Sequence, residues 1–376
     1  MLFHTPDLTD QELQVVAHID QIRDALRHQL PERRQWVGLL RRAMLASAIR
    51  GSNSIEGYNV SLDDAIAAVG GEEPVDAERE AWTAVLGYRD AMTYVLQLAD
   101  DAHFSYDESL IRSLHFMMLR YDLDKSPGRW RPSSVHVFDE RSHEVVYTGP
   151  DALEIPDLMH ELVTDLRTVD EAPVLIRAAM AHLNLAMIHP FRDGNGRMAR
   201  CLQTLVLARE GIISPPFSSI EEYLGANTDA YYRVLGAVGG GRWQPSRDAR
   251  PWLRFVLVAH YRQAQTMVRR AEEAERRWAI LTEEAARQHL PERAVAALFN
   301  ASMGFRLRNS VYRELAEVGE TIAGRDLKAL VKVGLLESRG ERRGRSYVAT
   351  DRLRLLDASI RQERRQIGDP FDLPAD

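Results

Sequence analysis

Apolar residues recur at helical spacing along most of the chain. Thr9 is a candidate N-cap for the first such stretch, and Gly57 is a candidate C-cap for the second. Residues 172–188 are apolar on nearly every side, which is typical of a helix buried at a domain centre. The predicted helix ends at His189-Pro190, because a proline cannot continue it. The pattern predicts further helices over residues 8–26, 36–57, 76–99, 105–120, 155–167, 197–211, 228–238 and 249–281.

One segment in the first half of the chain has a different period. Apolar and polar positions alternate at its start, a polar run follows, and a second apolar group comes after it. This pattern predicts a β-hairpin with a longer turn over residues 133–148. Its candidate strand residues are Val135, His136, Val137, Val146 and Tyr147.

The chain changes character near residue 285. Three short helical patterns follow, and residues 335–350 read as a hairpin with a glycine- and arginine-rich tip. Residues 293–350 hold 11 Lys and Arg against 6 Asp and Glu, a local excess of positive charge in a chain of net charge −7. We therefore place a domain boundary near residue 285 and expect any polyanion-binding surface to be local.

Composition narrows the class of protein. The 376 residues are 45% apolar and 27% charged, as in ordinary globular proteins. Cys201 is the single cysteine, and we expect it in the core. A single cysteine excludes a disulfide framework and favours a reducing compartment. The first residues lack the features of a signal peptide, and no uncharged run is long enough to span a membrane. We expect a cytoplasmic protein without a membrane partner.

The sequence HPFRDGNGRMAR, residues 189–200, gathers a base, an acid and arginines around a glycine turn. Glycines that open a helix expose free N–H groups, which form a ready anion site. Arg197 and Arg200 lie three residues apart and suit phosphate oxygens. Asp193 could hold Mg²⁺, and His189 could take a proton from a hydroxyl. Together these residues predict phosphoryl or nucleotidyl transfer.

Residues 189–200 also match, at every fixed position, the pattern H-P-F-x-[DE]-G-N-G-R-x-x-R of the Fic (filamentation-induced-by-cAMP) family. The chain resembles this family over roughly residues 40–260. The resemblance implies an all-α bundle with a β-hairpin flap and, mostly, transfer of AMP from ATP to a protein hydroxyl. It further implies that His189 is the base, that Asp193 binds Mg²⁺, and that the phosphates meet Gly194, Asn195, Gly196, Arg197 and Arg200.

The resemblance extends to three other segments. The hairpin around Val135 to Tyr147 looks like the flap that docks a target segment by β-augmentation. Residues 228–235 look like the stretch near the adenine, through Tyr231 or Tyr232, although tyrosines in such a pattern are more often core. Relatives often carry an asparagine shortly after this pair, whereas this chain has Val238 and Gly239. The adenine contacts are therefore left open.

Residues 52–57, SNSIEG, match the family's inhibitory pattern [ST]-x-x-x-E-[GN]. We expect an inhibitory helix over about residues 41–57, on which Glu56 pairs with Arg200 and so occupies the arginine meant for the γ-phosphate. Ser52, one turn earlier, could bond the Glu56 carboxylate or the local backbone. The alternative is an ordinary capping glutamate on a surface helix.

Residues 285–352 resemble a winged helix-turn-helix, with residues 321–333 as the recognition helix. Winged helices bind DNA, and they also serve in dimerisation or protein docking. Candidate DNA contacts are Arg325, Lys328 and Lys332 on one helical face, with Arg342, Arg343 and Arg345 in the wing.

The fold class expected is mainly α, a Fic-type bundle with a β-hairpin flap and a winged helix. We divide the chain into N-terminal helices (1–105), a catalytic core with the flap (106–284), the winged helix (285–352) and a tail (353–376). The leading interpretation is a self-inhibited adenylyltransferase that uses Mg²⁺ and ATP on a Ser, Thr or Tyr hydroxyl of a target protein or of itself. The alternatives are a DNA-binding regulator with a nucleotide-sensing core, and a Fic enzyme that removes AMP or transfers another nucleotide or phosphate. A homodimer is compatible with either.

Overall fold

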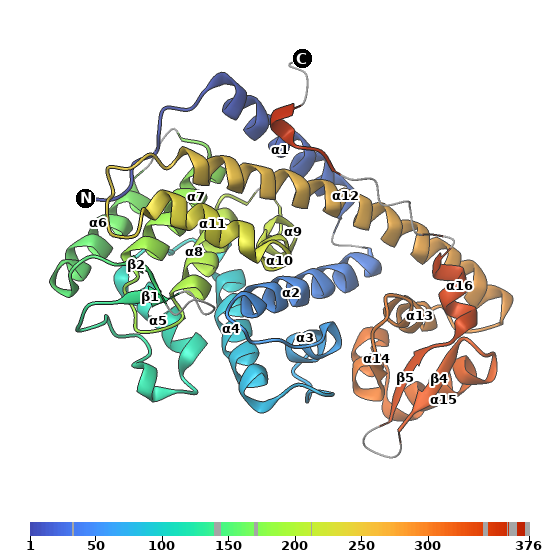
Figure 1. Ribbon diagram of the computed structural model, residues 1–376. Coiled ribbons are helices and arrows are strands. Elements are labelled where there is room, and N and C mark those ends of the chain that lie inside the picture. Colours follow the sequence, from blue (N-terminus) through green and yellow to red (C-terminus); the bar gives the residue numbers. More distant parts are fainter. Residues whose placement is uncertain are drawn as a thin grey trace.

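The structure is a computed structural model that describes the chain outside residues 32–33, 139–143, 169–171, 212, 341–344, 359, 361–366 and 373–376. It is mostly helical, and a two-stranded sheet lies at one edge of the helical bundle (Figure 1). The prediction of a mainly α protein with a β-hairpin is confirmed. None of the described helices is both long enough and apolar enough to cross a membrane.

The N-terminal part contributes four helices. Thr9 caps the first through a reciprocal capping box with Glu12, as its position in the sequence predicts. The second helix ends with Glu56 as its C-cap, one residue before Gly57. The four are α1 (Asp10–Gln29), α2 (Gln35–Ile55), α3 (Leu62–Val69) and α4 (Arg79–Leu98).

The centre of the bundle is built on α7 and α8, which pack closely against each other. Helix α7 (Val174–Ile188) is buried along nearly its whole length, as its apolar pattern predicts. Cys201 is buried in α8 (Asn195–Arg209), so its assignment to the core is confirmed. Around this pair lie α5 (Glu108–Leu119), α6 (Ile155–Arg167), α9 (Pro215–Ser218), α10 (Glu221–Ala226) and α11 (Thr228–Gly239).

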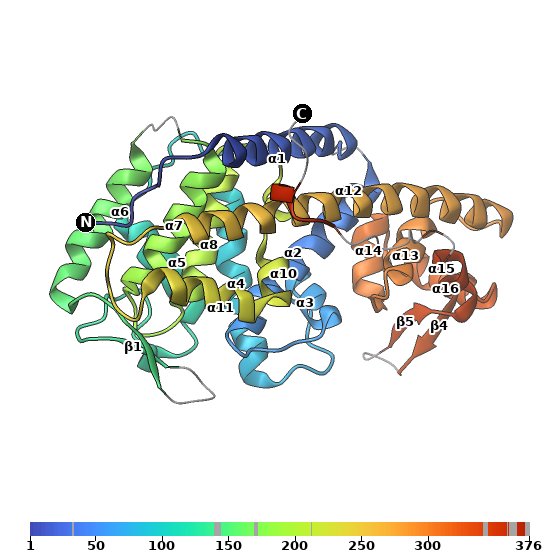
Figure 2. The same cartoon turned by 45° about the horizontal axis from the view of Figure 1, so that its top comes forward.

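Helix α12 (Arg250–Arg287) runs from this bundle to the C-terminal part, as Figures 1 and 2 both show. It packs against α1, α7 and α11 near its start and against α13 near its end. The boundary expected near residue 285 therefore falls inside the last turn of a continuous helix.

We call residues 294–358 the C-terminal module. It contains the predicted three helices and hairpin, and a short strand, β3, that the sequence pattern did not indicate. The antiparallel sheet has the order β3-β5-β4. The elements are α13 (Ala294–Ser302), β3 (Leu307–Arg308), α14 (Asn309–Ala316), α15 (Glu320–Lys332), β4 (Leu336–Arg339), β5 (Ser346–Ala349) and α16 (Asp351–Ala358).

The chain's last described turn returns to the bundle. The 3-10 turn η4 (Pro370–Asp372) contacts α1, where Gln11 donates to the Phe371 carbonyl at 2.7 Å. The Arg254 guanidinium lies 5.2 Å from the centre of the Phe371 ring. The η4 turn thus contacts both α1 and α12.

Candidate functional site

The loop between α7 and α8 carries the HPFRDGNGRMAR motif. His189 caps α7 with left-handed backbone (φ 52°), and Gly194 caps the start of α8 with φ 74°. Gly194 suits its position because it has no Cβ, whereas a Cβ there would lie 2.6 Å from Leu119 Cδ1. The chain thus turns sharply twice, and His189 and the N-terminus of α8 frame one loop.

Arg131 is buried beneath this loop and was not found from the sequence. Its Nε donates to the His189 carbonyl at 2.8 Å, while Nη1 and Nη2 donate to the carbonyls of Ser133 and Pro150, each at 2.7 Å. One guanidinium therefore ties the motif to both ends of the hairpin. A lone arginine 58 residues before the motif gives no pattern that would have revealed this role.

His189 itself is partly buried, and its Nδ1 lies 3.2 Å from the Ala186 carbonyl. Burial lowers the pKa of His189, and the nearby charge of Arg131 lowers it further. The Ala186 carbonyl and the charges of Glu56 and Asp193 oppose this shift without reversing it. The ring is therefore neutral at physiological pH, as a general base has to be.

His115 of α5 supports the middle of the loop and was also missed. Its Nδ1 accepts from the Gly128 N–H at 2.8 Å, which leaves Nε2–H to donate to the Asp193 carbonyl at 2.9 Å. Its ring stacks on Phe191 at a centroid distance of 3.6 Å. Burial lowers the pKa of His115 to about 4, so the ring keeps the neutral form that these bonds require.

The Asn195 side chain is hydrogen-bonded within the loop as well. Its Oδ1 accepts from the Phe191 N–H at 2.9 Å, and its Nδ2 donates to the Phe191 carbonyl at 3.0 Å. Asn195 is buried. In this structure the side chain therefore shapes the turn, and the phosphate contact expected of it remains a prediction.

The Asp193 carboxylate faces the same side of the loop as the start of α8. Its Oδ1 accepts from the Gly194 N–H at 2.7 Å, and its Oδ2 lies 2.8 Å from Lys125 Nζ and 3.8 Å from Arg197 Nη2. Burial alone would raise the pKa of Asp193, but the Lys125 hydrogen bond and the charges of Arg197 and Lys125 lower it. The Asp193 carboxyl is therefore ionised at neutral pH.

Asp193 fits a Mg²⁺ site of the kind that shares its ligands with a substrate. Such sites use one or two carboxylates, with phosphates and water completing the shell. Within the described residues, no three His, Cys, Asp or Glu side chains gather as metal ligands. One carboxylate beside a phosphate cradle is the donor set that this kind of site needs.

Arg197 is fully buried, and its Nε, Nη1 and Nη2 atoms have no hydrogen-bond partner in the described structure. Its guanidinium lies 5.0 Å from the centre of the Tyr58 ring. A buried, unbonded guanidinium is costly unless a ligand completes it. The nearby Gly196 leaves bare backbone, where a Cβ would collide with the Glu56 carboxylate. This arrangement suits a phosphate.

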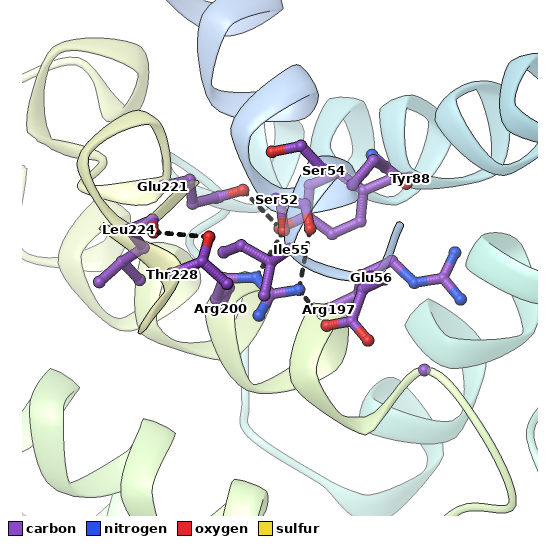
Figure 3. A network of polar contacts seen from close by, with 12 residues as sticks. Ser52, Ser54, Ile55, Glu56, Tyr88, Arg197, Arg200, Glu221, Leu224 and Thr228 are labelled. Atoms are coloured by element: carbon purple, nitrogen blue, oxygen red, sulfur yellow. Dashed lines mark hydrogen bonds and ion pairs between the residues drawn. The ribbon is translucent and has the colours of Figure 1, made fainter. Parts of the chain in front are cut away.

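Arg200, one turn further along α8, already has partners. Its Nε donates to Ser52 Oγ at 2.7 Å, and its Nη2 donates to the Ser52 carbonyl at 3.0 Å and to Glu56 Oε1 at 2.6 Å (Figure 3). The side chain of Arg200 is 1% exposed and that of Glu56 is 21% exposed. The contact expected between Glu56 and Arg200 is present, and Ser52 bonds the arginine itself rather than the glutamate.

Small residues let α2 approach this closely. A Cβ on Gly51 would lie 2.5 Å from the Glu221 carbonyl, and a Cβ on Gly225 would lie 2.7 Å from the Gly51 carbonyl. Helices α2 and α10 therefore touch through their backbones, which brings Ser52 and Glu56 within reach of α8.

Behind the contact lies a buried carboxyl group that the sequence did not reveal. Glu221 accepts from Tyr88 at 2.7 Å and from Thr204 at 3.1 Å, and it lies beside Ser52 (Figure 3). Burial raises the pKa of Glu221, and the hydrogen bonds of Glu221 and the charge of Arg200 offset this rise only in part. This network fixes the end of α2 that presents Ser52.

The two tyrosines expected near the adenine separate in the structure. Tyr231 is 1% exposed, and its hydroxyl lies 3.0 Å from His182 Nε2 in the core. Tyr232 is 48% exposed, and its hydroxyl donates to the Ile55 carbonyl at 3.3 Å. Val238 and Gly239 are buried at the end of α11. Tyr231 thus has the surroundings of a core residue, and only Tyr232 of the pair offers a ring to a ligand.

The flap consists of β1 (His136–Phe138) and β2 (Val145–Thr148), paired antiparallel with Val137 opposite Tyr147. Val146 and Phe138 are exposed, and Val135 joins the hairpin as its carbonyl accepts from the Gly149 N–H at 3.3 Å. Tyr147 instead points inward, and its hydroxyl donates to the Met187 carbonyl at 2.8 Å. Among the candidate docking residues, Tyr147 therefore anchors the flap to α7.

On the C-terminal module, Arg325, Lys328 and Lys332 are exposed along α15, and Arg345 is exposed before β5. Arg342 and Arg343 lie outside the described residues. The exposed side chains share one helical face, as their spacing predicts. DNA binding stays a prediction.

Known proteins resemble this chain over the segment that carries the HPFRDGNGRMAR motif. Residues 105–207 match the Fic/DOC family model. The chain is 31% identical over 210 residues to a protein adenylyltransferase of Nematostella vectensis, covering 54% of this chain and 44% of that protein. It is 26% identical over 182 residues to a probable protein adenylyltransferase of Aquifex aeolicus, covering 48% of this chain and 52% of that protein. The chain thus spans about half the length of these curated relatives.

Among solved structures, a Fic family protein from Desulfovibrio desulfuricans superposes with a TM-score of 0.60 at 22% identity. The match covers 93% of this chain and 98% of that one. Fic-1 from Caenorhabditis elegans superposes with a TM-score of 0.53 at 23% identity, over 68% and 71% of the two chains. These likenesses establish the fold.

Proposed function

Because this chain carries a Fic/DOC family domain at residues 105–207, we propose that it is a self-inhibited protein adenylyltransferase. It would move AMP from ATP to a Ser, Thr or Tyr hydroxyl of a target protein, or of itself. The relatives named as protein adenylyltransferases support this class of reaction. The observation that carries the proposal is the pair of buried arginines on α8, of which one has no hydrogen-bond partner among the described residues and the other is held by Glu56.

The reaction assigns a task to each group. His189 takes the proton from the target hydroxyl, whose oxygen attacks the α-phosphorus; a phosphorus–oxygen bond forms, the α–β bond breaks, and pyrophosphate leaves. The N–H groups that open α8 face the phosphates, and Arg197 neutralises their charge. Asp193 would hold Mg²⁺, which when bound neutralises further phosphate charge.

The inhibition follows from competition for one guanidinium. Arg200 is proposed to bind the γ-phosphate, but its Nη2 is bonded by Ser52 and Glu56. The Glu56 carboxylate also lies against Gly196, where a phosphate would approach the backbone. Two anions cannot occupy this place together, so ATP binds productively only after Glu56 leaves.

Target docking is proposed at the flap. Phe138, Val145 and Val146 are exposed apolar side chains on a hairpin, as a surface for strand addition requires. At Thr148, β2 already pairs with the segment 241–243 through bonds of 3.0 and 2.9 Å. The β1 strand is therefore the edge at which a target segment would add.

Two labelled forms of ATP test the reaction. The Glu56→Gly variant is incubated with Mg²⁺ and a lysate, and the ATP carries its label on either the α- or the γ-phosphate. The label is counted as the excess over the same lysate with Glu56→Gly/His189→Ala, because kinases of the lysate also transfer the γ label. Excess α label without excess γ label supports AMP transfer. Excess γ label would instead indicate a kinase-like reaction, and no excess of either would lead to tests of AMP removal and other nucleotides.

A second function is proposed for the C-terminal module, as a winged helix that binds DNA. The exposed cations of α15, Arg325, Lys328 and Lys332, favour it. A gel shift with random and genomic duplexes tests it, with the triple alanine variant of these residues as control. Absence of any shift at low salt would end this proposal and leave protein docking or dimerisation as the module's role.

A further inference from the structure

Lys125 ends the 3-10 turn η1 (Leu123–Lys125), between α5 and the flap, and its ammonium group is directed at Asp193. Its Nζ lies 2.8 Å from Asp193 Oδ2 and 3.8 Å from Asp122 Oδ2, and it donates to the Tyr58 hydroxyl at 3.2 Å. The Asp193 and Tyr58 oxygens lie within hydrogen-bond distance of Nζ, and the Asp122 oxygen is an ion-pair neighbour beyond that distance. Lys125 is thus a counter-ion of Asp193.

Tyr58 connects this lysine to the inhibitory segment. It stands two residues after Glu56, and its ring lies over the guanidinium of Arg197 at 5.0 Å and near Lys125 Nζ at 5.9 Å. The same short stretch of chain therefore places Glu56 on Arg200 and Tyr58 beside Arg197 and Lys125. The contacts of this stretch therefore involve Arg197, Arg200 and, through Lys125, the Asp193 carboxylate.

Lys125 contacts Oδ2 of Asp193, and Arg197 Nη2 lies 3.8 Å from the same oxygen. Oδ1 accepts the Gly194 N–H, so Oδ2 is the oxygen at which a metal ion would meet Lys125. A divalent cation and an ammonium compete for one carboxylate oxygen, because their repulsion is strong where neither is fully in water. The side chains are 27% exposed for Lys125 and 36% exposed for Asp193.

We propose that Lys125 is a resident cation which a divalent metal ion has to displace from Asp193, and that Tyr58 holds it there. This inference rests on the proposed function, since it takes Asp193 as the metal ligand. Release of Glu56 then frees the γ-phosphate arginine, while the metal position needs the separate departure of Lys125. Two contacts, on different side chains, keep the resting state unreactive.

Binding of Mn²⁺ measures this displacement without any turnover. The experiment uses purified full-length protein, ATP with a methylene group between the α- and β-phosphorus atoms, and the electron paramagnetic resonance signal of free Mn²⁺. All variants carry Glu56→Gly, so that the nucleotide can bind. Lys125→Met is compared with Lys125→Arg, with Tyr58→Phe, and with Arg276→Met, which removes an exposed cation of α12, as a surface control.

We expect Lys125→Met to tighten nucleotide-dependent Mn²⁺ binding about three- to tenfold, since the fraction of molecules with Asp193 free rises by that order. Lys125→Arg retains a cation and should bind Mn²⁺ as the parent does. Tyr58→Phe loses only the hydroxyl and should give a smaller gain than Lys125→Met. The gain should vanish when Asp193→Asn is added to Lys125→Met.

Unchanged or weaker Mn²⁺ binding in Lys125→Met would overturn the proposal and make Lys125 a phosphate contact instead. A gain that survives Asp193→Asn would also overturn it. If the Glu56→Gly parent binds Mn²⁺ with the nucleotide, such a failure concerns Lys125 alone. If the parent binds none, the proposed function fails together with the inference.

Discussion

Replacing Glu56 by alanine should destabilise the protein while leaving it ready for nucleotide. The change removes a charge-assisted hydrogen bond of 2.6 Å and leaves Arg200, 1% exposed, with the Ser52 bonds alone. A hydrogen bond between charged groups contributes about 1.5–3 kcal/mol to the free energy of unfolding. With an unfolding entropy of about 2 cal/mol/K per residue, the melting temperature of this chain should fall by about 2–4 °C.

Thermal unfolding with and without Mg²⁺-ATP measures both effects. In the variant, the phosphates can satisfy Arg200, so ATP should raise the melting temperature more than it does in the wild type. Glu210→Ala is the matched control, because it removes a surface ion pair with Arg177 of 3.1 Å and should change stability by about 1 kcal/mol at most. Equal melting temperatures and equal ATP effects for Glu56→Ala and wild type would refute this reasoning.

Two other predictions concern single side chains. In the Glu56→Gly background, the transfer rate should fall with decreasing pH only below the ordinary histidine pKa of about 6.5. The reason is that burial lowers the pKa of His189, so the base stays neutral to lower pH. A profile of rate against pH checks this, and a rate that already falls with decreasing pH above pH 7 would contradict it. Tyr231→Phe should lower the free energy of unfolding by about 1–3 kcal/mol, because it leaves the buried His182 Nε2 without its 3.0 Å partner. The same variant should keep its KM for ATP in the Glu56→Gly background, and a large rise in KM would return Tyr231 to the adenine site.

Much of the fold is readable from local patterns. The apolar period of residues 172–188 and the proline after His189 predict α7 and its end, and the alternation around Val137 predicts the flap. The short helices α3, α9, α10 and α16 were not predicted, since segments of four to eight residues often hold too little period to distinguish a helix from a turn. Strand β3 has two residues and exists only through its pairing with β5.

The site was predictable where its functional residues are contiguous in the sequence. His189, Asp193 and the arginines stand within twelve residues, and the spacing of Ser52 and Glu56 by one helical turn matched a known pattern. Arg131, His115 and Lys125 escaped notice, because each contacts the loop from another part of the chain and none forms a motif. The inward direction of Tyr147 likewise depends on packing that no local pattern records, whereas the pattern around Tyr231 already favoured a core position.

The central claim is that the chain has an intact transfer site, which Glu56 inhibits. The most direct measurement gives ATP labelled at the α-phosphate, with Mg²⁺, to wild type, Glu56→Gly and the double variant Glu56→Gly/His189→Ala, and compares the label on protein. We predict faint label for wild type, label at least about tenfold stronger for Glu56→Gly, in keeping with about 1.5 kcal/mol of released interaction, and none for the double variant. Equal label in wild type and Glu56→Gly would contradict the inhibition, and label in the double variant would remove His189 from the role of base.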